Sequence, residues 1–318
     1  MPRASRGLGR AVSAEHEVDS SRTHHNWDNS REPVVVVESG DIVHFDLPMT
    51  GEGQVQETSA VEDVEWDFDT IYNLGGPVYV EGAEPGETLE VEVLSLTPGP
   101  WGWTTIIPGL GLLPDDFPDP YLKIFDLRQG KRTILAPGVE IPFGPFLGTM
   151  GVHPDEPGQH SPFPPHKGGG NIDNRHLTEG AILWLPIWCT GALFSCGDAH
   201  AAQGDGEVCV TGIECPMQAS LRFELRKSRI SGPSFKPGAA RSSDAGGYHA
   251  TMGLHSDLME GAKVAVRNMI AWLVEEHRLA REDAYLLCSL AGDLKIHEIV
   301  DAGVWNVGMT LPLDVFVE

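Results

Sequence analysis

"GPVYVEGAEPGETLEVEVLSL" (residues 76–96) alternates apolar and polar side chains on both sides of the sequence GAEPGE. Such alternation is typical of strands with one buried face. Pro85 and Gly86 supply the fixed and the left-handed backbone angles that tight turns require. The stretch therefore predicts two strands joined by a turn.

The same pattern extends outward from this stretch in both directions. Further strands are expected within residues 33–47 (two strands around a Ser-Gly-Asp turn), 138–143, 181–195 and 206–228. Helical periodicity is nearly absent from residue 21 to residue 228, so this region predicts a mainly β fold, a β-sandwich or distorted barrel. We expect a β-rich core over residues 21–230, preceded by a mobile tail over residues 1–20.

The C-terminal region has a different pattern. Apolar residues at 258, 262, 265, 266, 269 and 273 predict one face of a helix within 255–278, with Ser256 or Asp257 as its N-cap. A second helix is expected over 281–293, and strands follow it. Residues 231–318 are therefore expected to form a smaller α/β portion packed on the core.

Charge and composition exclude several classes of partner. The 318 residues carry a formal net charge of -24, which disfavours nucleic acid and anionic membranes. No apolar run reaches the roughly 18 residues of a membrane helix. The first residues lack the apolar segment of a secretory signal, so we expect a cytoplasmic protein. The five cysteines form no C-x-x-C pair, which disfavours a structural zinc site.

A segment rich in glycine and acids contains no Lys or Arg between Arg175 and Arg222. Its acids are Glu179, Asp198, Asp205, Glu207 and Glu214. Carboxylates near apolar strands must reach solvent, become protonated or bind a cation. Asp198 and His200 share one face of an extended segment, a ligand pair suited to a divalent metal. The alternative is a polar loop that faces water.

Two further segments carry candidate ligands. Residues 151–177 contain His153, His160, His166 and His176, followed by Gly168 to Gly170 and then Asn171 and Asp173. Residues 23–29, "THHNWDN", place His24 and His25 beside Trp27. A flexible surface loop and a half-ordered terminus remain the respective alternatives.

Ser195 and Cys196 raise a second catalytic possibility, because both lie close in sequence to Asp198 and His200. A Ser-His or Cys-His pair could transfer an acyl group. The sequence lacks a G-x-S-x-G elbow, however, and a buried small hydrophobe is the commoner role for such a cysteine.

Residues 151–214, from "GVHPDEPGQH" through "GDAHAAQGDGE" to "TGIE", closely resemble the core of the acetamidase/formamidase family. "GGPVYVEGAEPGE" (75–87), "THHNWDN" and "EDAYLLCSLAGDLKIHEIVD" (282–301) resemble other stretches of the family, with Gly75 and Glu87 replacing its usual Thr and Asp. The resemblance implies hydrolysis of a short aliphatic amide such as formamide or acetamide. It also implies a mainly β fold with a smaller α/β part, a bound divalent metal, and a homodimer or higher homo-oligomer.

For such a reaction we expect Asp198 and His200 to bind the metal, with Asn171, Asp173 and His25 as possible further ligands. Zn²⁺ is the first candidate, and Ca²⁺ and Fe²⁺ are the alternatives. Glu207 or Glu214 is expected to act as general base, with Asp205 as a further catalytic candidate. The expected substrate-binding residues are His153, Gly169, Gly170 and Trp103. A Cys196-dependent amidase and a non-catalytic module that binds a metal or small ligand remain the competing hypotheses.

Overall fold

A computed structural model describes residues 13–238, 247–300 and 303–317. The first strands are β1 (Glu15–Val18), β2 (Thr23–His24), β3 (Val35–Val37), β4 (Ile42–Leu47), β5 (Leu74–Val80), β6 (Thr88–Pro98), β7 (Trp101–Ile106), β8 (Tyr121–Asp126), β9 (Arg132–Ala136) and β10 (Val139–Pro142). They are followed by β11 (Phe146–Val152), β12 (Gly169–Asn171), β13 (Ile182–Pro186), β14 (Phe194–His200), β15 (Met217–Arg226), β16 (Ser234–Lys236), β17 (Tyr248–His255), β18 (Asp293–Glu298) and β19 (Trp305–Pro312). The helices are α1 (Leu258–His277) and α2 (Arg281–Leu290), with short 3₁₀ turns at Val61–Asp63 and Leu313–Val315.

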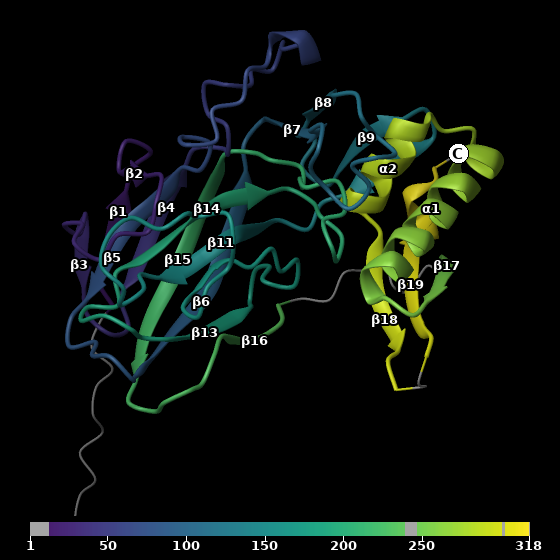
Figure 1. The fold of residues 1–318 in the computed structure, drawn as a ribbon. Coiled ribbons are helices and arrows are strands. Elements are labelled where there is room, and N and C mark those ends of the chain that lie inside the picture. The colour runs from purple at the N-terminus through teal and green to yellow at the C-terminus, as the bar shows by residue number, and fades with distance from the viewer. Residues whose placement is uncertain (1–12, 239–246, 301–302, 318) are drawn as a thin grey trace, which may run out of the picture.

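Two six-stranded sheets form the β-rich part (Figure 1). One has the order β1-β4-β15-β6-β13-β16, and the other has the order β12-β11-β14-β5-β2 with β3 also paired to β5. Their inner faces share one hydrophobic core. Phe194 of β14 and Phe223 of β15 pack edge to face across it, with ring centroids 5.1 Å apart. The prediction of a mainly β fold is confirmed. The sheets pack face to face, and no sheet of the described residues closes into a barrel.

The stretch at residues 76–96 forms the two expected strands, β5 and β6. They do not pair with each other, because β5 belongs to one sheet and β6 to the other. The turn at GAEPGE thus carries the chain from one layer to the next, and the turn between β3 and β4 does the same. Local alternation predicts a strand but not its partner.

Two expectations need correction. Within residues 206–228, only β15 is a strand, and residues 206–216 form a loop with isolated bridges. Glycines and left-handed backbone angles interrupt that loop. In the expected tail, residues 15–18 form β1, which pairs in parallel with β4. Residues 1–12 lie outside the described residues.

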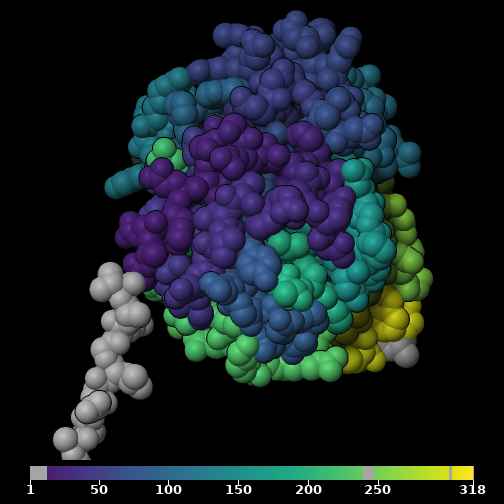
Figure 2. Space-filling model, turned by 90° about the vertical axis from the view of Figure 1, so that its left-hand side faces the viewer, coloured from purple at the N-terminus to yellow at the C-terminus, as the bar shows by residue number. Residues whose placement is uncertain are grey.

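The C-terminal part contains both helices and the sheet β17-β19-β18 (Figure 1). Asp257 caps α1 as expected, since its side chain accepts a hydrogen bond from the backbone N–H of Glu260. In Figure 2 the N-terminal segments cover much of the face turned toward the viewer, and the C-terminal part shows only at its edge. Neither helix in the described ranges combines the length and hydrophobicity needed to span a bilayer.

Candidate active site

Strand β14 places Asp198 on the wall of a cavity of about 150 Å³. His200, two residues further along β14, contacts Asp198 and Glu214 of this wall. The rest of the wall comes from β7, β12 and several loops. The residues lining it are Thr50, Phe68, Ile71, Tyr72, Trp103, Ile107, Leu110, Phe163, Asn171, Asp173, Asp198, Glu207, Val210, Thr211 and Glu214. The cavity therefore joins an acidic end, next to His200, to an apolar end.

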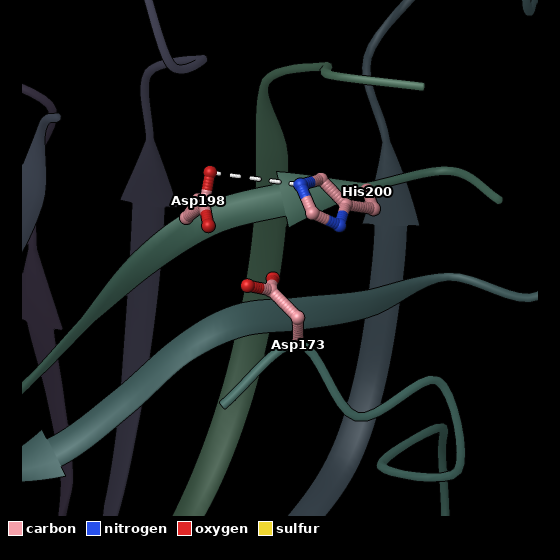
Figure 3. Close-up of side chains that lie close together, drawn as sticks. All are labelled: Asp173, Asp198 and His200. Carbon is pink, nitrogen blue, oxygen red and sulfur yellow. Dashed lines mark ion pairs between the residues drawn. The ribbon is translucent and has the colours of Figure 1, made fainter. Parts of the chain in front are cut away.

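His200 is enclosed by acids. Its Nε2 atom lies 3.0 Å from Oε1 of Glu214 and 3.5 Å from Oδ1 of Asp198. Figure 3 shows Asp198 and His200 projecting from the same strand, with the carboxylate of Asp173 pointing toward them from a neighbouring segment. Ligand atoms of Asp173, Asp198 and His200 all lie within 4.8 Å of one another, as do those of His200, Glu207 and Glu214. Carboxylates and imidazole at this spacing match the donor set of a divalent metal.

Several polar atoms of this cluster are buried without a hydrogen-bond partner among the described residues. They are Nδ1 of His200, Oε2 of Glu214 and Oδ1 of Asp173. Nε2 of His200 contacts Glu214 as an ion pair, but it is not aligned for a hydrogen bond. Buried polar groups are normally satisfied, so each of these atoms needs an explanation. A bound cation would satisfy carboxylate oxygens and an imidazole nitrogen together. The residues present therefore fit a metal ion.

Burial and mutual repulsion shift the protonation of the acids. Burial, followed by the charge of Asp198, raises the pKa of Asp173 to about 7. Burial and then the charge of Asp173 raise the pKa of Glu207 well above its usual value, and burial also raises that of Glu214. Burial opposes ionisation of Asp198 as well, but the neighbouring His200 and a hydrogen bond from Thr50 lower its pKa. Without a bound cation, these shifts favour the protonated forms of Asp173, Glu207 and Glu214.

The backbone is unusual where the carboxylates enter the site. Asp173, Asp198 and Glu207 have φ angles of 41°, 54° and 43°. A non-glycine residue with positive φ costs on the order of 1–2 kcal/mol and tends to occur at functional sites. Gly148 of β11 has no side chain, and this allows the carboxylates of Asp173 and Asp198 to lie close to its backbone. A Cβ atom there would lie 2.6 Å from Oδ1 of Asp173 and 2.7 Å from Oδ2 of Asp198.

Hydroxyl groups that the sequence did not indicate hold Asp198 and Asn171 in place. The hydroxyl of Thr50 donates to Oδ1 of Asp198 over 2.7 Å. Thr149 donates to the side-chain oxygen of Asn171 over 2.7 Å, and the Asn171 amide donates to the hydroxyl of Tyr72 over 3.2 Å. Burial, and then the charge of Asp198, raises the pKa of Tyr72, so its hydroxyl stays protonated.

The C-terminal part holds the loop that contains Glu207. The backbone N–H of Gly204 donates to the carbonyl of Ser289, and the backbone N–H of Cys209 donates to the side-chain hydroxyl of Ser289. Tyr285 donates to the carbonyl of Val208, and Leu294 donates to the carbonyl of Asp205. Glu207 is thus positioned from both sides by α2 and β18.

The expected site residues separate into two groups. The residues that line the cavity are Asp198, Asp173, Asn171, Glu207, Glu214 and Trp103. His200 does not line it but contacts Asp198 and Glu214 directly beside it. Asp205, His25, His153, Gly169 and Gly170 do not line it. Asp205 faces His176 at 3.4 Å, and His25 donates to the carbonyl of Tyr72 over 2.5 Å. Gly169 and Gly170 lie in β12, paired with β11.

Ser195 lies in a separate buried cluster. Its hydroxyl is 2.8 Å from Nε2 of His24 and 3.3 Å from Nε2 of His153. Nδ1 of His153 accepts a hydrogen bond from the N–H of Asp28, so the ring proton is on Nε2, which donates to the hydroxyl of Ser195. Ser195 then donates to His24, whose Nδ1 donates to the carbonyl of Asn26 over 2.8 Å. These three side chains are buried away from the cavity, so the geometry gives this chain of hydrogen bonds a structural role.

Cys196 belongs to the main hydrophobic core. Complete burial raises the pKa of its thiol. A nucleophilic cysteine needs a lowered pKa and access to substrate. The structure therefore offers no support for a covalent role of Cys196.

Comparisons with known proteins agree on one family. The model of the Acetamidase/Formamidase family matches residues 11–160 and 158–318. An acetamidase of Mycolicibacterium smegmatis is 26% identical over 284 residues, covering 68% of this chain and 70% of the relative. A formamidase of Methylophilus methylotrophus is 26% identical over 276 residues, covering 67% and 68%.

Solved structures extend the likeness to the whole fold. The acetamidase of Bacillus halodurans has 30% sequence identity and a TM-score of 0.66, covering 94% of this chain and 97% of its own. A gamma lactamase from Delftia acidovorans superposes with a TM-score of 0.87 at 24% identity, covering 95% and 93% of the two chains. At that identity the second likeness concerns the fold alone.

Proposed function

Because the chain belongs to the Acetamidase/Formamidase family, we propose that it hydrolyses a short aliphatic amide to a carboxylate and ammonia. The acidic cluster around His200, at the closed end of a small cavity, is the observation that carries this function. An amide carbon is a weak electrophile, so hydrolysis requires an activated water, stabilisation of the developing oxyanion and a proton for the leaving nitrogen.

In this proposal Asp173, Asp198 and His200 hold a divalent metal ion, with Asn171 as a possible further ligand. When bound, such an ion lowers the pKa of water and polarises a carbonyl oxygen. The unpaired buried atoms of Asp173 and His200 support this assignment. Zn²⁺ suits the mixed oxygen and nitrogen donors best, and Ca²⁺ and Fe²⁺ are the alternatives.

Glu207 acts as the general base and then the general acid. It lines the cavity, and burial raises its pKa above the usual value, which makes its carboxylate a stronger base. Its carboxylate accepts a proton from the attacking water and delivers it to the amide nitrogen as the C–N bond breaks. Glu214, which accepts from the N–H of Gly212 and faces His200, orients the imidazole.

Tyr72 and Trp103 complete the site. The protonated hydroxyl of Tyr72 lines the cavity and donates to the substrate carbonyl oxygen. Trp103, 1% exposed, forms a wall next to Thr50 and Glu214. A buried aromatic wall excludes water from the reacting centre, which strengthens the electrostatic interactions there.

Ammonia release from formamide, acetamide and propionamide tests this function directly. Purified protein supplied with Zn²⁺ should release ammonia from at least one of them, and Glu207→Gln should lower kcat by about 10²-fold or more. A non-catalytic binding module would take up the metal but release no ammonia from any amide, and that outcome would refute the proposal.

The protein is further proposed to be cytoplasmic and to assemble as a homodimer or higher homo-oligomer. Strand β17 lies at the edge of its sheet and exposes Tyr248, Met252 and Leu254. Exposed apolar side chains on an open edge favour pairing with another chain. The molar mass measured by light scattering tests the assembly.

A further inference from the structure

The outer end of the cavity is apolar, in contrast to its acidic inner end. Four large side chains at its mouth are substantially exposed, namely Phe68 (41%), Leu110 (40%), Phe163 (40%) and Val210 (37%). They come from four separate loops. Scattered exposed apolar residues are ordinary, but several that line one cavity indicate a binding surface.

Contacts between the aromatic rings hold this mouth together. The rings of Tyr72 and Phe163 meet edge to face with centroids 5.0 Å apart, and those of Phe68 and Phe163 are 6.0 Å apart. The amide of Asn171 donates to the backbone carbonyl of Phe163 over 3.0 Å. The apolar mouth is thus tied directly to a residue of the acidic end. In Figure 1 the segment between β4 and β5, which includes Phe68, projects beyond the strands.

The size of the cavity exceeds what the smallest amides need. About 150 Å³ equals the liquid volume of roughly five water molecules. Formamide and acetamide would occupy the acidic end and leave the apolar side chains in contact with water. A substituent that extends from the amide carbon toward Phe163 would remove those side chains from water, which is favourable.

The charge of the lining restricts what that substituent can be. Among the described residues that line the cavity, none is Lys or Arg, while Asp173, Asp198, Glu207 and Glu214 are acidic. A substrate carboxylate would find no cationic partner and would lose its hydration at the apolar mouth. An uncharged hydrocarbon group is the chemistry that fits.

We propose that Phe68, Leu110, Phe163 and Val210 form a specificity site for the acyl substituent, so that the preferred substrate is an uncharged primary amide with a hydrocarbon group larger than methyl. This inference rests on the proposed amide hydrolysis and names its substrate class. The substituent lies outside the reacting centre, and its burial contributes binding energy that formamide cannot supply.

Steady-state kinetics with matched substrates test the inference. The value of kcat/KM should rise about fourfold for each added methylene group from acetamide to pentanamide. The value of kcat/KM for 4-methylpentanamide should exceed that for succinamate, which has a carboxylate in place of the isopropyl group, by roughly 100-fold or more. A value of kcat/KM that stays flat or falls beyond acetamide would overturn the inference, as would equal use of succinamate.

A pair of phenylalanine variants tests the assignment of the residues. Phe163→Ala should reduce the ratio of kcat/KM for 4-methylpentanamide to that for formamide by roughly tenfold. Phe235→Ala is the matched control, because Phe235 is 42% exposed but lies in β16, outside the cavity. An unchanged ratio in Phe163→Ala would overturn the assignment. Hydrolysis of formamide without any preference for longer amides would refute this inference alone, whereas no ammonia from any amide would refute the proposed function.

Discussion

Arg175 and Asp293 form a buried ion pair that links the segment following Asp173 to the first residue of β18. The same oxygen of Asp293 accepts a hydrogen bond from the backbone N–H of Asp205 over 3.1 Å. One carboxylate therefore fixes the two segments that supply Asp173 and Glu207. The C-terminal part, although it contributes no residue to the lining of the cavity, positions the acids inside it.

Replacing Arg175 should reveal this coupling. Arg175→Met leaves Asp293 buried with one cationic neighbour, Lys295, at 3.7 Å. Removing one partner of a buried pair costs about 3–5 kcal/mol of unfolding free energy, and kcat should fall because Asp173 moves. Urea denaturation and steady-state kinetics measure the two effects. Arg226→Met is the control, because its ion pair with Glu90 is half-exposed and its loss should cost less than about 1 kcal/mol.

The double variant Arg175→Met/Asp293→Leu separates folding from positioning. Two apolar side chains should recover much of the lost stability, because no unpaired charge remains buried. They cannot accept the hydrogen bond from Asp205, so kcat should stay low. Wild-type kcat in the double variant would show that the ion pair has no part in placing the acids.

Gly148→Ala tests the close approach of two acids. The added methyl group would lie between the carboxylates of Asp173 and Asp198, whose oxygens are 2.6 Å and 2.7 Å from the Cβ position. We expect kcat for formamide to fall by about 10²-fold, since a small displacement of catalytic groups is costly. Gly232→Ala should have no effect, because a Cβ atom there meets nothing within 4 Å. Full activity in Gly148→Ala would contradict the described geometry.

The sequence predicted the acidic half of the site and little of its surroundings. Asp198, His200, Glu207 and Glu214 were found because a segment without Lys or Arg needs some other partner for its acids. Thr50 could not be found in this way, since it lies 148 positions from Asp198 and nothing local marks a contact at that separation. Strands were likewise predictable from alternation, whereas the assignment of β5 and β6 to different sheets depends on long-range packing.

Asp205 shows the limit of arguments from spacing. It lies two residues from Glu207, which would place both on one face of a strand. The segment is a loop with Gly206 and Glu207 at positive φ, so the two side chains diverge. Asp205 faces His176, while Glu207 lines the cavity.

Cys196→Ala distinguishes the proposed chemistry from a cysteine-dependent one. The thiol is fully buried in the core, so its loss should leave kcat for formamide within about twofold of the wild type while lowering stability by about 1 kcal/mol. Ammonia release and thermal denaturation measure these quantities. Abolished hydrolysis by a folded Cys196→Ala protein would favour the covalent mechanism instead.

The buried histidines predict a dependence of stability on pH. Burial lowers the pKa of His153 to about 4, below its ordinary value of 6.5. Between these two pKa values the unfolded chain binds a proton at His153 that the folded protein does not. The free energy of unfolding therefore falls by about 1.4 kcal/mol for each unit that the pH is lowered. His153→Gln lacks this group. Its stability deficit relative to the wild type, measured by urea denaturation, should therefore shrink by about 2 kcal/mol from pH 7 to pH 5, and an unchanged deficit would contradict the assignment.

Metal content, measured together with activity, tests the central claim most directly. Elemental analysis and formamide hydrolysis should be compared between wild type and Asp198→Asn after growth with Zn²⁺ and extensive dialysis. We predict that the wild type retains a divalent metal and releases ammonia, and that Asp198→Asn loses both while keeping its fold. Undiminished metal content and activity in Asp198→Asn would contradict the account of how this site works.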